Sequence, residues 1–181
     1  NTHCHLELSY LKHQVKEKTN LHGFIKELVS IRNDFTDSQR FAAIVAAEQE
    51  MKANGIVAVG DISNGDSTFD LKQKGTLQYH TFIEVFGSNP NIANEAFKAA
   101  ENLYNKYFDK ERVSITPHAT YSVSNPLTKL INKHCIENKS LVSLHNQETE
   151  SENEFFISGQ GALFDFLEIS KHQTFTPTGK N

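Results

Sequence analysis

The feature that most constrains the fold of this chain is a repeated alternation between helical stretches and short apolar runs. Residues 37–54 carry apolar side chains at helical spacing, with Asp37 or Ser38 as the N-cap residue and Gly55 as the stop. Residues 56–62 follow as a β-branched run without polar alternation, which is typical of a strand buried on both faces. The pattern therefore predicts a parallel sheet flanked by helices.

The same alternation continues along the rest of the chain. It predicts strands at 79–86, 113–116 and 141–144, helices at 91–108 and from Ser124 onward, and a helical stretch at 151–169 that is broken near Gly159. Strands and helices of these lengths imply βαβ units with right-handed crossovers. With the opening residues counted as the stub of a strand, we expect five strands.

Length and charge narrow the possible classes. The chain has 181 residues, enough for a single domain spanning 1–181, whereas a closed (β/α)₈ barrel contains about 250. A net charge of −4 argues against a nucleic-acid partner. No apolar run approaches the roughly 20 residues that cross a bilayer, and two cysteines make no disulfide framework. We expect a cytoplasmic protein that binds neither nucleic acid nor membrane, and Asn1 in place of methionine indicates a piece of a longer one.

Titratable side chains recur at the predicted ends of the strands. In parallel α/β folds the reactive groups lie at the carboxyl ends of the strands, which share one edge of the sheet. The side chains at or near these ends are His3, His5, Asp61, Glu84, His118 and His145. The sequence therefore predicts one polar rim that carries the chemistry.

His3 and His5 are the first candidate pair on this rim. Residues two apart in an extended segment point to the same side, so both imidazoles can reach one metal ion while Cys4 turns away. With nine histidines in the chain the spacing also arises by chance. The alternative interpretation is two polar residues in a flexible amino terminus.

His145 and Glu148 form the second candidate pair. The imidazole of His145 can bind a metal ion that acts as a Lewis acid, and the carboxylate of Glu148, three residues later, can transfer protons. The alternative is that Glu148 only begins an acidic first helical turn, and that interpretation is the one we adopt for Glu150, Glu152 and Glu154.

His118 follows Pro117, between a predicted strand and a predicted helix. This position faces the rim and suits the orientation of a substrate. A loop histidine that bonds to nearby backbone explains the same spacing equally well.

Together these elements resemble a known family. The motifs NTHCHLELS at 1–9, GDIS at 60–63, PHATYSVS at 117–124 and HNQE at 145–148 occur in the order found in the amidohydrolase superfamily. The sequence is most similar to its metal-dependent aminohydrolase branch, which includes cytosine, S-adenosylhomocysteine and aminofutalosine deaminases and the chlorohydrolases. The resemblance covers nearly the whole chain. It implies a (β/α)₈ TIM-barrel type of α/β fold, here a partial barrel of about strands one to five.

The resemblance also implies roles for individual residues. His3, His5 and His145 correspond to metal ligands, with zinc expected and iron possible as the divalent ion, and Glu148 corresponds to the catalytic acid. His118 corresponds to a substrate-binding residue, and we place Glu84 beside it. The family's further histidine after the sixth strand and aspartate after the eighth have no counterpart in 1–181, so this portion is expected to be inactive alone and to self-associate.

Three functions remain open at this point. The first is hydrolytic deamination of a small molecule with an amino-substituted nucleobase or nucleoside-like ring. The second is cyclic amide hydrolysis or dechlorination, which uses the same metal and acid. The third is a non-catalytic α/β binding module whose histidines are incidental.

Overall fold

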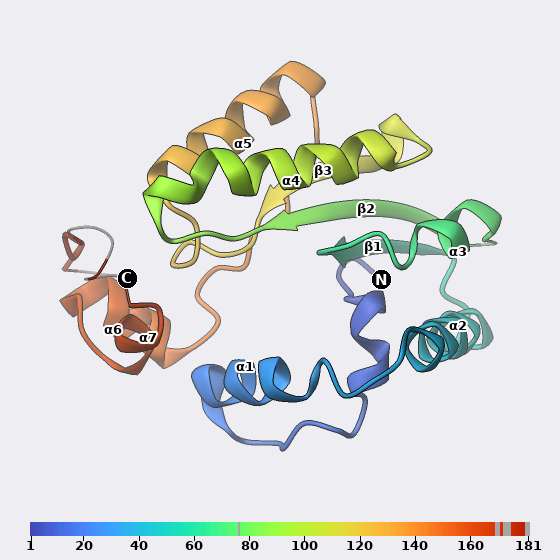
Figure 1. Cartoon of the computed structure of the whole chain (residues 1–181), viewed down its shortest axis with the longest axis horizontal. Helices are drawn as coiled ribbons and strands as arrows, with labels where there is room; N and C mark the ends of the chain where they lie inside the picture. Colours follow the sequence, from blue (N-terminus) through green and yellow to red (C-terminus); the bar gives the residue numbers. More distant parts are fainter. Residues whose placement is uncertain (76, 169–170, 172–174, 180–181) are drawn as a thin grey trace.

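A three-stranded parallel sheet forms the centre of the structure (Figure 1). The protein is described by a computed structural model over residues 1–75, 77–168, 171 and 175–179. The strands are β1 (Ala58–Ser63), β2 (Gln78–Val85) and β3 (Val113–Pro117), and neighbours in the sheet follow chain order. They match the second, third and fourth predicted strands, so the α/β class with a parallel sheet is confirmed.

Helices connect and flank these strands. The α-helices are α1 (Asn20–Ile31), α2 (Asp37–Ala53), α3 (Phe69–Lys74), α4 (Ala93–Lys106), α5 (Asn125–Asn138), α6 (Glu150–Ser158) and α7 (Ala162–Phe166). The 3₁₀ turns are η1 (Leu6–Leu11), η2 (Pro90–Ile92) and η3 (Lys110–Arg112). The sequence predicted α2, α4, α5 and the broken α6–α7 pair, but it missed η1, α1 and α3. Within the described residues no helix combines the length and apolar character needed to cross a membrane.

Capping hydrogen bonds and glycine conformations determine where the helices begin and end. The N-cap of α2 is Thr36 rather than Asp37 or Ser38, and Thr36 and Gln39 satisfy each other's backbone N–H groups in a capping box. The break between α6 and α7 falls where predicted, because Gly159 and Gly161 adopt positive φ angles of 67° and 98°. The predicted end of that stretch at residue 169 lies outside the described residues.

The core lies between the sheet and the helices on one of its faces. Figure 1 shows α4 and α5 together over that face, whereas α1 and the α6–α7 pair lie away from it. Ile83 and Ile115 are fully buried beneath α4 and α5. Because side chains alternate along a strand, Glu84 and Thr116 point to the opposite face. That face, at the carboxyl ends of β2 and β3, carries the polar groups considered below.

The predicted first and fifth strands are not strands in the structure. Cys4 forms an isolated parallel bridge with Asp61, and His145 forms one with Ala119. Residues 141–144 have no regular strand pairing, and their apolar side chains are about half exposed. The physical reason is that Thr116 bonds to the backbone of Ser143 through its hydroxyl, which replaces a backbone ladder. Residue 57 is likewise exposed, so the predicted burial on both faces is wrong for the start of the second strand.

Asp61 also departs from its predicted place on the rim. It lies inside β1, fully buried, and its carboxylate is 2.5 Å from the ammonium group of Lys72 on α3. Lys72 also donates hydrogen bonds to Ser63 and Thr81 on the sheet. The short helix α3 holds Lys72 against the strands.

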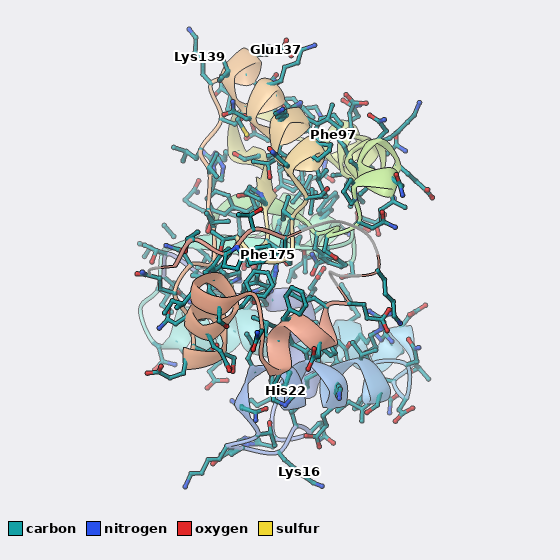
Figure 2. The ribbon with its side chains drawn as sticks, turned by 90° about the vertical axis from the view of Figure 1, so that its left-hand side faces the viewer. Lys16, His22, Phe97, Glu137, Lys139 and Phe175 are labelled. Atoms are coloured by element: carbon teal, nitrogen blue, oxygen red, sulfur yellow. The ribbon has the colours of Figure 1, made fainter. Side chains whose placement is uncertain are left out.

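The aromatic surroundings of His134 mark the contact between α4 and α5. Its ring centroid lies 4.8 Å from that of Tyr104 and 5.9 Å from that of Phe97. Figure 2 labels Phe97 and Glu137 on these two helices. Burial lowers the pKa of His134 below 6.5, against the opposing effect of Glu101 and Glu137. The imidazole therefore packs as a neutral ring.

We expect Lys72→Met to reduce the free energy of unfolding by about 3–5 kcal/mol, because it leaves the buried Asp61 carboxylate without its partner. Urea denaturation followed by circular dichroism measures this loss. The matched control is Lys106→Met, which removes the exposed pair with Asp66 and should leave stability unchanged. Equal effects of the two substitutions would contradict the role assigned to the buried pair.

We expect His134 to make the folded protein less stable as the pH falls below about 6.5. Because its pKa is lowered on folding, the unfolded chain takes up the proton first and is favoured at low pH. The loss of unfolding free energy between pH 8 and pH 5 should therefore be smaller in His134→Asn than in the unchanged chain. His13→Asn, at an exposed position, serves as the control and should keep the original pH dependence.

Candidate metal centre

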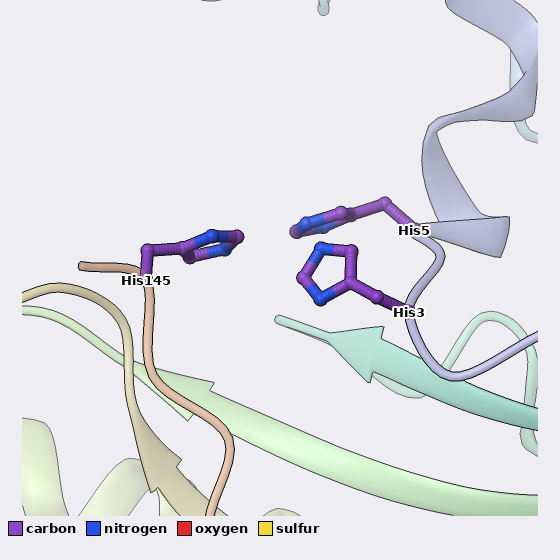
Figure 3. A group of neighbouring side chains, drawn as sticks. All are labelled: His3, His5 and His145. Carbon is purple, nitrogen blue, oxygen red and sulfur yellow. The ribbon is translucent and has the colours of Figure 1, made fainter. Parts of the chain in front are cut away.

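Three imidazoles that are far apart in the sequence, those of His3 and His5 and that of His145, converge on one point (Figure 3). The ring centroids of His3 and His145 are 4.8 Å apart, and those of His5 and His145 are 5.9 Å apart. One nitrogen from each of the three rings lies within 4.8 Å of the others. The structure thus brings together the three residues that the sequence nominated as metal ligands.

The opening segment is held in place by β1. Cys4 pairs with this strand through its backbone, donating to Gly60 O at 3.0 Å and accepting from the Ile62 amide at 2.8 Å. The Cys4 side chain turns to Asp61, and burial together with this carboxylate raises the pKa of the thiol to about 12. Because neighbouring side chains alternate, His3 and His5 lie on the other side, with ring centroids 5.1 Å apart.

His145 reaches the same point from beyond β3. Its amide donates to His118 O at 2.9 Å, which continues the pairing past the carboxyl end of the strand. Its Nε2 lies 3.5 Å from Glu84 Oε1, and its Nδ1 lies 3.4 Å from Glu148 Oε1. The Glu84 carboxylate is the main reason that the pKa of His145 is raised. His145 is therefore flanked by a carboxylate at each ring nitrogen.

His118 and Glu84 lie on the other side of His145. The ring centroids of His118 and His145 are 5.1 Å apart, and Nδ1 of His118 lies 2.6 Å from Ser122 Oγ. Burial lowers the pKa of His118, which favours the neutral ring. Burial alone would raise the pKa of Glu84, but contacts with His145, His118 and Asn64 outweigh it and hold that pKa below its usual value.

Glu148 is positioned by two residues that the sequence analysis did not single out. Tyr121 donates a hydrogen bond from its hydroxyl to Glu148 Oε2 at 2.8 Å. Glu152, only 1% exposed, accepts one from the Glu148 amide at 2.7 Å and another from the Thr120 hydroxyl at 2.9 Å. The interpretation of Glu152 as a merely dipole-favouring surface acid is therefore wrong. The Thr149-to-Glu152 spacing of a capping box was the signal that could have found it.

Glu7 is a further, partly buried acid to which the sequence analysis gave no role. It accepts hydrogen bonds from the amides of Asn64 at 2.8 Å and Gly65 at 3.2 Å. Burial raises the pKa of Glu7 to about 7. These bonds tie η1, which follows directly after His5, to the loop after β1.

The three imidazoles fit a divalent metal ion. Metal binding requires neutral imidazole. Burial lowers the pKa of His5 and so favours its neutral form, whereas Glu84 raises the pKa of His145, so an ion bound there would displace the His145 proton. The Nδ1 atom of His5 is buried without a hydrogen-bond partner, as expected for a nitrogen whose lone pair serves an ion. Zinc–nitrogen bonds of about 2.0–2.1 Å require donor atoms no more than roughly 4.2 Å apart, so small ring rotations would complete the site.

The chain is similar in sequence to known deaminases. No family model matches the chain. It is 28% identical over 170 residues to an aminodeoxyfutalosine deaminase of Deinococcus radiodurans, covering 91% of this chain. The chain spans 39% of the length of that relative.

Solved structures show the same likeness in the fold. The chain superposes on a crystal structure of Helicobacter pylori aminofutalosine deaminase in complex with methylthio-coformycin, with a TM-score of 0.81 and 23% identity. The match covers 98% of this chain and 44% of that one. A triazine hydrolase from Arthobacter aurescens gives a TM-score of 0.69 at 16% identity, over 95% of this chain and 44% of that one. These structures show the likeness in the fold, and the predicted resemblance to deaminases is confirmed by the sequence similarity to an aminodeoxyfutalosine deaminase.

We expect Glu152→Ala to reduce the free energy of unfolding by about 1–3 kcal/mol, because it leaves the Glu148 amide and the Thr120 hydroxyl without their acceptor. Urea denaturation is the measurement. Glu154→Ala, at an exposed position on the same helix, is the matched control and should change stability little. If both substitutions cost the same, Glu152 acts only through the helix dipole and not through Glu148.

Proposed function

We propose that this chain belongs to a metal-dependent hydrolase that removes the amino group from a nucleobase or nucleoside-like ring. The observation that carries the proposal is the convergence of His3, His5 and His145 on one point, with Glu148 Oε1 3.4 Å from His145 Nδ1. The relation to an aminodeoxyfutalosine deaminase supports the choice of deamination over other hydrolyses.

The three histidines would hold the ion. Zinc or iron bound there would supply a water whose pKa is lowered from 15.7 to about 7. Glu148 would accept a proton from this water and deliver it to the ring nitrogen beside the reacting carbon. The carbon gains oxygen, and its amino group leaves as ammonia after a second proton transfer.

The remaining site residues would bind and orient the substrate. Glu84 and His118 lie next to His145, on the face of the sheet away from α4 and α5. Tyr121 holds Oε2 of Glu148, and Oε1, which faces His145 Nδ1, would move the proton. An open depression of about 580 Å³ lies next to Glu148 and is lined also by Thr149, residues 15–21 and Phe24.

We further propose that the chain represents strands one to five of a (β/α)₈ barrel. The parallel bridges of Cys4 with Asp61 and of His145 with Ala119 lie at the two edges of the sheet, where a first and a fifth strand would pair. The exposed apolar side chains beside β3 are Leu141, Val142 and Leu144. They favour further polypeptide against this edge, and in its absence they favour self-association.

We expect the purified chain to bind about one equivalent of Zn²⁺, and His145→Ala to lower the affinity at least about tenfold, since one of three ligands is lost. Equilibrium dialysis with metal analysis measures both. The control His13→Asn removes an exposed histidine outside the cluster and should bind as before. Substoichiometric metal that is unchanged in His145→Ala would favour the non-catalytic binding module.

Activity separates the remaining alternatives. A protein that extends this chain to the length of its relatives should release ammonia from aminopurines or aminopyrimidines, and Glu148→Gln should lower kcat by about 10²–10⁴. Chloride release from chlorotriazines, or opening of a cyclic amide, in place of ammonia release would replace deamination by the corresponding hydrolysis.

A further inference from the structure

A second group of potential ligands lies directly beside the three-histidine cluster. Glu84, His118 and His145 each offer one ligand atom, and these atoms also lie within 4.8 Å of one another. Glu84 is buried, and the two histidines are partly buried. His145 belongs to both groups, so the two potential ion positions are neighbours.

The carboxylate of this second group is already oriented. Asn64 donates a hydrogen bond from its side-chain amide to Glu84 Oε2 at 3.0 Å. The other oxygen, Oε1, faces His145 Nε2 at 3.5 Å. A partner that fixes one oxygen and leaves the other pointing at the site is the arrangement that orients metal ligands in proteins.

The second imidazole is oriented in the same way. Nδ1 of His118 lies 2.6 Å from Ser122 Oγ, and the same hydroxyl accepts a hydrogen bond from the Ala119 amide at 3.2 Å. A hydrogen bond at Nδ1 leaves Nε2 as the nitrogen available for coordination. All of these partners come from the loops after β1 and β3, so the second position needs no residue of the opening segment.

Because both ion positions use His145, they cannot be occupied at the same time. A neutral imidazole has one nitrogen with a free lone pair. An ion at either position therefore takes the lone pair of His145 from the other. The chain holds one ion at a time, and the donor atoms decide where it lies.

We propose that Glu84, His118 and His145 form an alternative divalent-cation position, which Mn²⁺ occupies in preference to the three-histidine position. A carboxylate oxygen beside two imidazoles is a harder donor set than three imidazoles, so between the two positions Mn²⁺ favours this one and Zn²⁺ the three histidines. This position goes beyond the proposed function, in which Glu84 and His118 contact the substrate. An ion placed there occupies both substrate-binding residues, so the identity of the metal decides whether the substrate site is open.

The test is a titration of the 181-residue chain with Mn²⁺ and, separately, with Zn²⁺, followed by calorimetry and, for Mn²⁺, by electron paramagnetic resonance. Glu84→Gln and His118→Asn should weaken Mn²⁺ binding about tenfold or more while leaving Zn²⁺ binding within about twofold. His3→Ala should do the reverse. His145→Ala should weaken both, and the exposed control His13→Asn should change neither.

Two results would overturn the proposal. One is Mn²⁺ binding that is unaffected by Glu84→Gln and His118→Asn, and the other is Mn²⁺ binding that is lost in His3→Ala. Glu84→Gln is isosteric, so it remains informative if the histidine variant fails to fold. Failure of the proposed function has a separate signature, because it would appear as Zn²⁺ binding that is indifferent to His3 and His145.

Discussion

The buried carboxylate of Asp61 is the interaction on which the rest of this structure depends. One of its oxygens accepts hydrogen bonds from the Leu6 amide and the Cys4 thiol, and the other meets Ser63 and Lys72. A fully buried charge persists only when it is paired and hydrogen-bonded. Asp61 therefore joins the helix α3 to the opening segment. It holds Cys4, which lies between His3 and His5, against β1.

The same constraint explains why the site lies where it does. The opening segment runs along one edge of the sheet and His145 lies beyond the other, yet their imidazoles meet. The parallel arrangement makes this possible, because every carboxyl end lies at one rim. Glu84 and Glu148 then approach His145 from different sides, and this shared imidazole links the proposed metal ion, the proposed proton carrier and the alternative cation position.

Two neighbouring residues, Tyr121 and Glu152, fix the position of Glu148. Glu152 is a buried acid whose hydrogen bonds hold the backbone of Glu148, and Tyr121 holds its side chain. Catalytic carboxylates are effective when a rigid shell fixes their geometry. In this chain that shell comes from the loop after β3 and the first turn of α6. The catalytic candidate and its supports thus belong to two elements that are joined by hydrogen bonds.

The sequence by itself determined the order of strands and helices, the rim position of His118 and His145, and the pairing of His3 with His5. These follow from local periodicity and from the alternation of side chains along an extended chain. Tertiary structure alone decided the inward burial of Asp61, the short helix that carries Lys72, and the loss of regular strand pairing at 141–144. Each of these depends on a partner distant in the sequence, and local periodicity carries no information about such partners.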